Sequence, residues 1–325
     1  MELKRISGKH KNSKLLYYLK NYSLLILPRF LFASKVLKNP FFLNKNDEVY
    51  INSRVDYYNK IENDIILDES VDSLTDIYKR KRNTYFFDLR QYSRFFRDSN
   101  KMSVLFGDIT HVPEIPSITK SRPVQVDNYN SVLFKLNKIR HFLFIEDAKQ
   151  FNDKKNMLVS RGKVHPLQVN RINFLKQYFS HPLCDIGKVN DNELNPDWFV
   201  NRMTIEEQLD YKFILSLEGN DVATNLKWVM SSNSIAVMTK PKFETWFMEG
   251  TLIPDFHYIK IKDDFSDLEE KLNYYSENVK EALAIINNAH EYVNQFKNKK
   301  REDAICFLVL EKYFKMTNQS TSLKK

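Results

Sequence analysis

The residues best suited to bind a phosphate lie in the segment Lys212–Met230, KFILSLEGNDVATNLKWVM. A strand-like apolar run ends close to Gly219, and a helix is expected to follow it. Backbone amides at such a turn and the positive end of a helix dipole favour a diphosphate, and Lys227 adds a cation. The segment predicts either a diphosphate site or an ordinary capped helix. The side chains that could cap this helix are Asn220, Asp221 and Thr224.

Asp108 is the carboxylate best placed to act as a base. It follows Gly107 at the end of the apolar run Ser103–Phe106. A carboxylate in this position could take a proton from an attacking hydroxyl, or it could simply cap a turn. The acidic pair Glu146 and Asp147 also ends an apolar run, but it opens a charged stretch and no glycine turn follows it. We therefore rank Asp108 above this pair.

Glycine and cysteine usage excludes several enzyme classes. The chain has six glycines, no two closer than 25 residues, and two cysteines. This spacing excludes a dinucleotide fingerprint, a Walker A loop and the nucleophile elbow of the hydrolases. Two cysteines can form neither a disulfide framework nor a four-thiolate zinc site, and they favour a reducing, cytosolic compartment. We expect no metal and no other cofactor.

The elements that would position these residues alternate between short apolar runs and longer amphipathic ones. This alternation predicts an α/β fold with largely parallel sheets, in which ligands bind beyond the carboxyl ends of the strands. The expected strands are Ser103–Phe106, Phe142–Ile145, Met157–Ser160, Phe213–Leu217, Ser234–Met238 and Tyr258–Ile261. The expected helices are Leu167–Phe179, a short helix opened by the capping box Thr204–Glu207, Asp264–Tyr275, Asn278–Phe296 and residues 302–316.

The two ends of the chain carry its net charge of +9. Residues 1–14 hold five Lys or Arg and one Glu, and residues 297–325 hold eight Lys or Arg and three acidic residues, which accounts for the whole excess. A neutral body with basic ends favours an anionic membrane surface over a nucleic acid as partner. Solvated tails would give the same pattern.

Residues 15–33, LLYYLKNYSLLILPRFLFA, form the most apolar stretch of the chain. Polar residues and a proline interrupt it, so it is too short for a membrane-spanning helix and a poor signal peptide. A buried helix, an amphipathic helix at a membrane interface and a partner-docking helix all fit the pattern. Aromatic and leucine side chains beside basic ones favour the interface.

Several segments, in order along residues 80–296, resemble glycosyltransferase family 90. That family includes bacterial LpsA-type lipopolysaccharide glycosyltransferases, fungal capsule xylosyltransferases and animal protein O-glucosyltransferases, and the bacterial branch is the most similar. The matching segments are Leu105–Pro123, Ser160–Arg171, His181–Gly187, Lys212–Met238 and Lys240–Tyr258.

The resemblance implies a GT-B fold, in which two Rossmann-like domains face a central cleft. It implies an inverting transfer of glucose, xylose or a similar sugar from a UDP-sugar to a hydroxyl of a glycan or glycolipid, without a metal. We expect an acceptor-side domain at residues 1–150, a donor domain at 151–300, and a C-terminal helix and basic tail at 301–325 that packs back on the first. The expected location is the cytoplasm, with a peripheral position on the inner face of the membrane.

The family pattern also assigns roles to residues of this chain. It places the general base at Asp108, ahead of a V-P-x-I-P-like stretch. Arginines suit the diphosphate because a guanidinium binds phosphate in a bidentate fork, although a surface ion pair is the alternative. Asn225 stands where eukaryotic members carry arginine, so the family pattern does not specify the donor contacts there or the identity of the sugar. The implied donor-binding residues are Arg161, Gly162, Arg171, Gly219, Asn220, Asp221, Ala223, Thr224, Asn225, Lys227, Glu244 and Glu249.

Two other functions remain open at this stage. One is a phosphate-handling α/β enzyme that is not a transferase. The other is a membrane-surface binding module with a degenerate nucleotide-sugar site.

Overall fold

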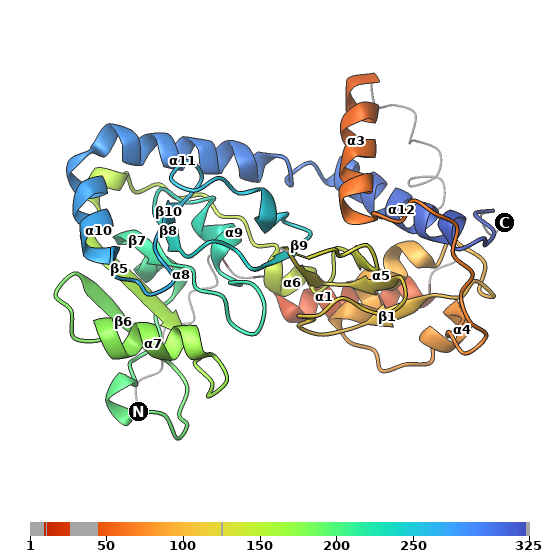
Figure 1. Cartoon of the computed structure of the whole chain (residues 1–325), viewed down its shortest axis with the longest axis horizontal. Helices are drawn as coiled ribbons and strands as arrows, with labels where there is room; N and C mark the ends of the chain where they lie inside the picture. The colour runs from red at the N-terminus through yellow and green to blue at the C-terminus, as the bar shows by residue number, and fades with distance from the viewer. Residues whose placement is uncertain (1–9, 11, 27–44, 125, 323–325) are drawn as a thin grey trace. The chain divides into compact units, whose positions relative to one another are not determined.

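The computed structural model describes residues 10, 12–26, 45–124 and 126–322, which Figure 1 draws in colour. The chain divides into two units. Unit 1 consists of Met1–Asn12, Arg140–Lys242 and Glu249–Gln295, and unit 2 of Ser13–Ile139, Phe243–Met248 and Phe296–Lys325. The charged stretch that Glu146 and Asp147 open, residues 147–156, lies within unit 1, where Phe151 is buried in the core. The chain thus passes between the units several times.

A five-stranded parallel sheet forms the centre of unit 1. Its strand order is β10-β8-β7-β5-β6, and Leu158 of β5 pairs with Phe213 of the neighbouring β7. The inner strands β7 and β8 are almost entirely apolar and buried, as is typical of parallel strands that are covered on both faces. The strands are β5 (Lys155–Gly162), β6 (Cys184–Lys188), β7 (Tyr211–Leu215), β8 (Ile235–Met238) and β10 (Ile259–Lys260).

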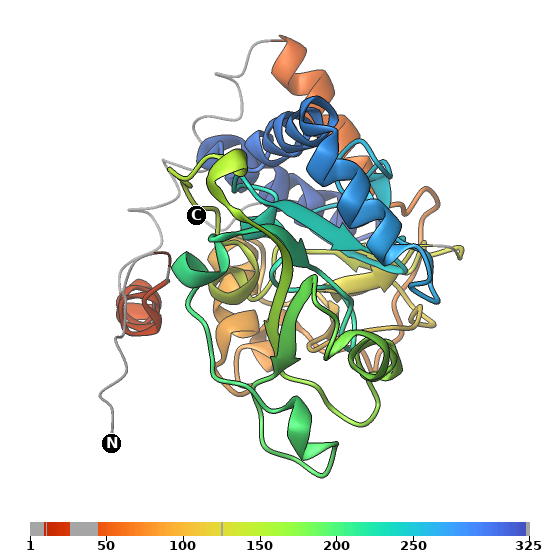
Figure 2. The same cartoon turned by 90° about the vertical axis from the view of Figure 1, so that its left-hand side faces the viewer.

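Besides the short helix α9 (Leu226–Val229), the three longer helices of unit 1 contact this sheet (Figures 1 and 2): α7 (Val169–Tyr178), α10 (Leu268–Glu277) and α11 (Val279–Asn294). Their apolar side chains share one core with the strands. The capping box at Thr204 is confirmed, since its hydroxyl and the Glu207 side chain cap the start of α8 reciprocally. The shorter elements of the unit are η2 (Phe151–Asp153), η3 (Pro196–Trp198), α8 (Ile205–Gln208), α9 (Leu226–Val229) and η4 (Glu249–Thr251).

Unit 2 contains a three-stranded parallel sheet of order β1-β2-β4 and a small antiparallel pair, β3 with β9. Its long C-terminal helix contacts α3 and α5. The strands are β1 (Ser103–Leu105), β2 (Ser117–Thr119), β3 (Ser121–Pro123), β4 (Ser131–Leu133) and β9 (Phe243–Thr245). The helices are α1 (Lys14–Ile26), α3 (Lys45–Tyr58), α4 (Leu74–Ile77), α5 (Thr84–Ser93) and α12 (Lys299–Met316), and α6 (Lys138–His141) lies where the chain passes to unit 1.

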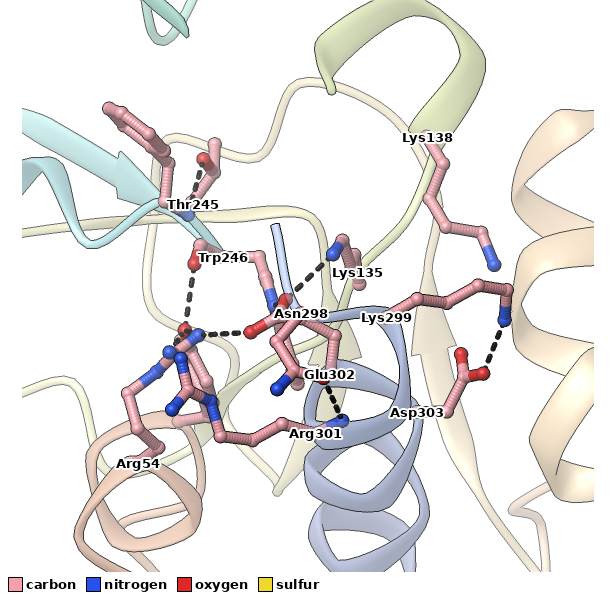
Figure 3. Close-up of polar contacts among 12 residues, drawn as sticks. Arg54, Lys135, Lys138, Thr245, Trp246, Asn298, Lys299, Arg301, Glu302 and Asp303 are labelled. Carbon is pink, nitrogen blue, oxygen red and sulfur yellow. Dashed lines mark hydrogen bonds and ion pairs between the residues drawn. The ribbon is translucent and has the colours of Figure 1, made fainter. Parts of the chain in front are cut away.

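A buried carboxylate joins the three chain segments of unit 2 (Figure 3). Glu302 of α12 accepts hydrogen bonds from Arg54 Nη2 at 3.0 Å, Lys135 Nζ at 2.6 Å and Trp246 Nε1 at 2.6 Å. Its side chain is 3% exposed. Such a network is stable only when its charges are paired and hydrogen-bonded, so it fixes how the three segments fit together.

The α/β class and the parallel sheets predicted from the sequence are confirmed. Of the expected strands, only Phe142–Ile145 is wrong: it pairs with no strand, and Ile145 N instead donates to Ser231 Oγ at 3.0 Å. The expected helices with predicted bounds are present within a few residues of those bounds. Strands β2, β3, β4, β6 and β9 had no counterpart among the expectations.

The apolar stretch at 15–33 begins as a surface helix, α1. Its inner face packs on α5: Tyr17 Oη donates to Asp88 Oδ1 at 2.7 Å, and the rings of Tyr18 and Tyr22 lie edge-on to Phe87. A fully buried helix is therefore wrong for this part of the stretch, and residues 27–33 lie outside the described residues. Within the described part of the chain, no helix is both long and apolar enough to cross a membrane.

Gly187 within β6 has a packing role. A Cβ atom there would lie 2.6 Å from Val200 Cγ1 and 2.9 Å from the Trp198 carbonyl oxygen, so no side chain fits. We expect Gly187→Ala to lower the free energy of unfolding by about 1–3 kcal/mol through overpacking. Thermal denaturation would measure this loss. Gly162→Ala is the control, because its Cβ would meet only Arg171 Nη1 at 3.7 Å, and an equal loss in both would contradict the packing argument.

Candidate functional site

Arg171 is the centre of a cationic site at the carboxyl ends of two neighbouring strands of unit 1. From α7, its guanidinium reaches the segments that follow β5 and β7. Nη1 donates to the Lys163 carbonyl at 2.8 Å, Nη2 to the Leu217 carbonyl at 2.9 Å, and Nε to the Glu218 carbonyl at 3.3 Å. These bonds hold both strand ends and the guanidinium in one fixed arrangement.

Two glycines make room for this side chain. A Cβ atom on Gly219 would lie 3.1 Å from Arg171 Nη2 and 3.2 Å from Gln168 Nε2, closer than side chains normally pack. Gly162 also lies beside the guanidinium. Gln168 in turn donates to Asn220 Oδ1 at 3.0 Å, which fixes the turn after β7. The structure therefore brings together four of the predicted donor residues: Gly162, Arg171, Gly219 and Asn220.

The electrostatics of this site favour an anion. Burial, reinforced by the charge of Arg140, lowers the pKa of Arg171, while Asp221 opposes the shift. A guanidinium nevertheless stays protonated at physiological pH. Among the described residues, the bonds of this guanidinium to three carbonyls use three of its five N–H groups. Two N–H groups therefore remain for a ligand. A phosphate oxygen is the ligand that such a fork binds best.

Arg161, the other predicted donor arginine, is engaged within the sheet. It forms an ion pair with the Asp185 carboxylate of β6 and donates to the Asp185 carbonyl at 2.7 Å and the Ser160 carbonyl at 2.9 Å. Burial tends to raise the pKa of Asp185, but hydrogen bonds from Tyr211 and Arg161 lower it below its usual value. A carboxylate held ionised in this way keeps Arg161 in place.

Lys227 and Glu249 form a buried ion pair in unit 1, with side chains 1% and 2% exposed. The helix expected after Gly219 begins later than its predicted caps imply: α9 spans Leu226–Val229, and its N-cap residue Asn225 makes no side-chain cap bond. The predicted capping roles of Asn220, Asp221 and Thr224 are therefore wrong. Asn225 Nδ2 instead donates to the Leu215 carbonyl at 2.9 Å, and Ala223 is buried.

Asp108 lies in unit 2, just beyond the carboxyl end of β1. Gly107 before it has φ +126°, a backbone conformation that favours glycine. Lys120, which is buried between β2 and β3, forms an ion pair with the Asp108 carboxylate. Ser121 fixes the adjoining backbone, since its Oγ accepts from Ile109 N at 3.1 Å and donates to Ile109 O at 2.9 Å. The carboxylate is thus held from two sides, yet its side chain remains 27% exposed.

Glu244 lies in unit 2, whereas Glu249 lies in unit 1. Glu244 is 2% exposed, and its carboxylate accepts a 2.7 Å hydrogen bond from Arg122 Nε and another from Tyr57 Oη. Asp147 of the rival acidic pair forms a buried ion pair with Lys154, with their Nζ and Oδ2 atoms 2.7 Å apart. These carboxylates face side chains of the protein, whereas Asp108 is partly open to solvent.

Sequence reasoning missed Lys120, Gln168 and Arg140. Lys120 and Gln168 lie inside segments that resemble the family, but their side chains are ordinary residue types and their partners are distant in sequence. Only the fold places Lys120 beside Asp108 and Gln168 beside Asn220. Over the described ranges, no cluster of three or more His, Cys, Asp or Glu side chains could hold a metal ion.

Comparison with known proteins gives a specific match. The model of glycosyl transferase family 90 matches residues 135–325. The O-glucosyltransferase LpsA of Dichelobacter nodosus is 41% identical over 266 residues, which cover 82% of this chain and 83% of that protein. An uncharacterized protein, 179R of Invertebrate iridescent virus 6, is 30% identical over 104 residues, covering 30% of this chain and 9% of that protein. The extent of the first two matches establishes that this chain belongs to glycosyltransferase family 90 and is a glycosyltransferase.

Proposed function

We propose that this protein transfers glucose from a UDP-sugar to a hydroxyl group of a bacterial surface glycan, such as the core of a lipopolysaccharide. The observation that supports this most strongly is the 41% identity to an O-glucosyltransferase, which extends over more than four fifths of both chains. The partners of the reaction are then a nucleotide-sugar donor and a glycan or glycolipid acceptor.

In this proposal unit 1 binds the donor. Support comes from the Arg171 guanidinium, which is held at the carboxyl ends of parallel strands and, among the described residues, keeps two N–H groups for a ligand. As the bond between the sugar and the diphosphate breaks, negative charge develops on the leaving UDP. A fixed cation lowers the energy of that state without having to reorganise.

In the same proposal unit 2 supplies the base. Asp108 takes the proton of the acceptor hydroxyl while the oxygen attacks C1 of the sugar from the face opposite UDP, so the anomeric configuration inverts. Lys120 orients the carboxylate through their ion pair. A separate parallel sheet in each unit supports the GT-B class, which contains two such sheets.

A donor screen tests this function. The protein is incubated with a lipopolysaccharide core acceptor and, in turn, UDP-glucose, UDP-galactose, UDP-xylose or UDP-N-acetylglucosamine, and UDP release is measured. We expect release from UDP-glucose that depends on the acceptor, and a product with the inverted linkage by NMR. Faster transfer from another donor would reject glucose, and a retained configuration would reject the mechanism.

Replacement of Arg171 tests the donor site. We expect Arg171→Ala to weaken UDP binding by about 1.5–3 kcal/mol, the contribution of a hydrogen bond to a charged group. Isothermal titration calorimetry measures the affinity, and Arg171→Lys separates charge from the bidentate fork. Lys176→Ala, an exposed cation on the same helix, is the control. Unchanged UDP affinity in a folded Arg171→Ala protein would exclude Arg171 from the donor site.

A further inference from the structure

A cavity of about 220 Å³ lies within unit 2, between α1, α5 and the start of α12. Its apolar lining comes from Leu24 and Leu25 of α1 and from Phe87 and Phe95 of α5 and the turn after it. The volume is below the usual range for a complete small-molecule ligand, so it suits one part of a larger molecule. An apolar lining of this kind fits a hydrocarbon group.

The remaining lining of this cavity is strongly basic. Among the described residues that line it, Lys20, Arg90, Arg94 and Lys299 are basic, and one, Asp303, is acidic. Two of these cations have fixed positions: Arg94 Nη1 donates to the Leu24 carbonyl at 3.0 Å, and the Arg90 guanidinium lies 4.4 Å from the centre of the Tyr78 ring. The matching ligand is therefore amphiphilic, with an anionic group beside an apolar one.

Lys299 and Asp303 lie one turn apart on α12 and form an ion pair at the cavity (Figure 3). Lys299 still has 71% of its side chain exposed. This pair accounts for one of the four basic side chains, and Asp303 is the one acidic side chain among the described residues that line the cavity. The charge of the cavity is thus complementary to a phosphate rather than to a cation.

The outer face of α1, outside the cavity, also carries exposed apolar side chains. Leu15 is 71% exposed, Leu16 66% and Leu19 58%, although the opposite face of the helix is fastened to α5. Three leucines on one exposed helix face cost free energy in water and are stabilised by burial in an apolar phase. Basic side chains beside such a face are typical of helices that lie in a membrane interface.

We propose that α1 and this cavity form a binding site for an anionic phospholipid in a membrane surface. The lipid phosphate lies among the basic residues of the cavity, the glycerol and the first methylene groups lie against its apolar lining, and the exposed leucines enter the interface. Charge complementarity is the argument for this occupant over an uncharged apolar partner. The inference is independent of the transferase reaction, because its test requires no activity.

Vesicle sedimentation with the full chain tests the proposal. The protein is expected to bind vesicles of phosphatidylcholine with phosphatidylglycerol, and to bind phosphatidylcholine alone much more weakly. Lys20→Glu should weaken binding about fivefold or more, which corresponds to about 1 kcal/mol for one basic residue at the surface. The matched control is Lys280→Glu, an exposed lysine of unit 1. Equal losses in the two variants would overturn the site, because net charge alone would then explain binding.

A second pair of variants tests the apolar part. Leu15→Ser should weaken vesicle binding about tenfold, and added salt should not reproduce this loss because salt screens charges and not apolar contacts. The control is Ile66→Ser, which should have little effect; the Ile66 side chain is 86% exposed and lies elsewhere in unit 2. Thermal melting of each variant verifies that it is folded. Unchanged vesicle binding by Leu15→Ser would overturn the proposal. The proposal would also be overturned if the protein self-associates and Leu15→Ser abolishes this self-association, because a second copy of the chain would then cover the leucine face.

Discussion

Replacing Asp108 by asparagine is expected to lower turnover by a factor of about 10² to 10⁴ while UDP binding remains unchanged. Asparagine has the same shape and can still accept the hydrogen bond from Lys120, but it cannot take a proton from the acceptor hydroxyl. The expected loss is that of general-base catalysis. Steady-state rates of UDP release with saturating acceptor measure it, and calorimetry measures UDP binding in the same preparation.

Glu114→Gln is the matched control for this variant. Glu114 is exposed and lies six residues further along the same loop, so its replacement removes one negative charge from the same region. We expect its turnover to stay close to that of the unchanged protein. Near-normal turnover in Asp108→Asn would exclude Asp108 from the chemical step, and an equal loss in both variants would reveal an effect of net charge.

Lys227→Met is expected to lower the free energy of unfolding by about 3–5 kcal/mol. The substitution removes the ammonium group that forms an ion pair with the buried Glu249 carboxylate. The carboxylate then keeps its charge in the protein interior, which solvates a charge poorly, and this lowers stability. In a unit of this size the loss corresponds to a melting temperature lower by about 6–20 °C. Thermal denaturation followed by circular dichroism measures this shift.

Two further variants give this stability prediction its controls. Lys240→Met removes an exposed lysine of the same unit and should change the melting temperature little. Lys227→Met combined with Glu249→Leu removes both charges and should recover most of the lost stability. An unchanged melting temperature in Lys227→Met, together with weaker UDP binding, would instead show that Lys227 contributes to the donor site.

The sequence predicts the parts of the fold whose physics is local. The amphipathic period of α7, α10, α11 and α12 and the capping box at Thr204 determine these helices largely by themselves, and all are present. Strands of three residues, such as β2 and β4, are too short to show a period. Only their neighbours in the parallel ladder specify them, and these are not visible in the sequence.

The candidate site was predictable to a similar degree. Gly219 at the end of an apolar run is a local feature, whereas Arg171 was assigned only through the resemblance to the family, and the structure brings the two together. The buried ion pair of Lys227 with Glu249 was not predictable, because the two residues are 22 positions apart in the sequence and only the fold brings them together. The resemblance to a family located the Asp108 loop but gave no sign of Lys120 beside it.

The position of Glu302 determines the order in which the protein can fold during synthesis. Arg54, Lys135 and Trp246 leave the ribosome first, and their shared carboxylate follows only with α12. Unit 1, whose sheet ends with β10 and whose last helix is α11, has all of its core available before that point. Unit 1 can therefore fold before unit 2 is complete. Until α12 is synthesised, Arg54 and Lys135 of unit 2 lack the carboxylate with which they are buried in the folded protein. We therefore expect chaperones to act on unit 2 during synthesis.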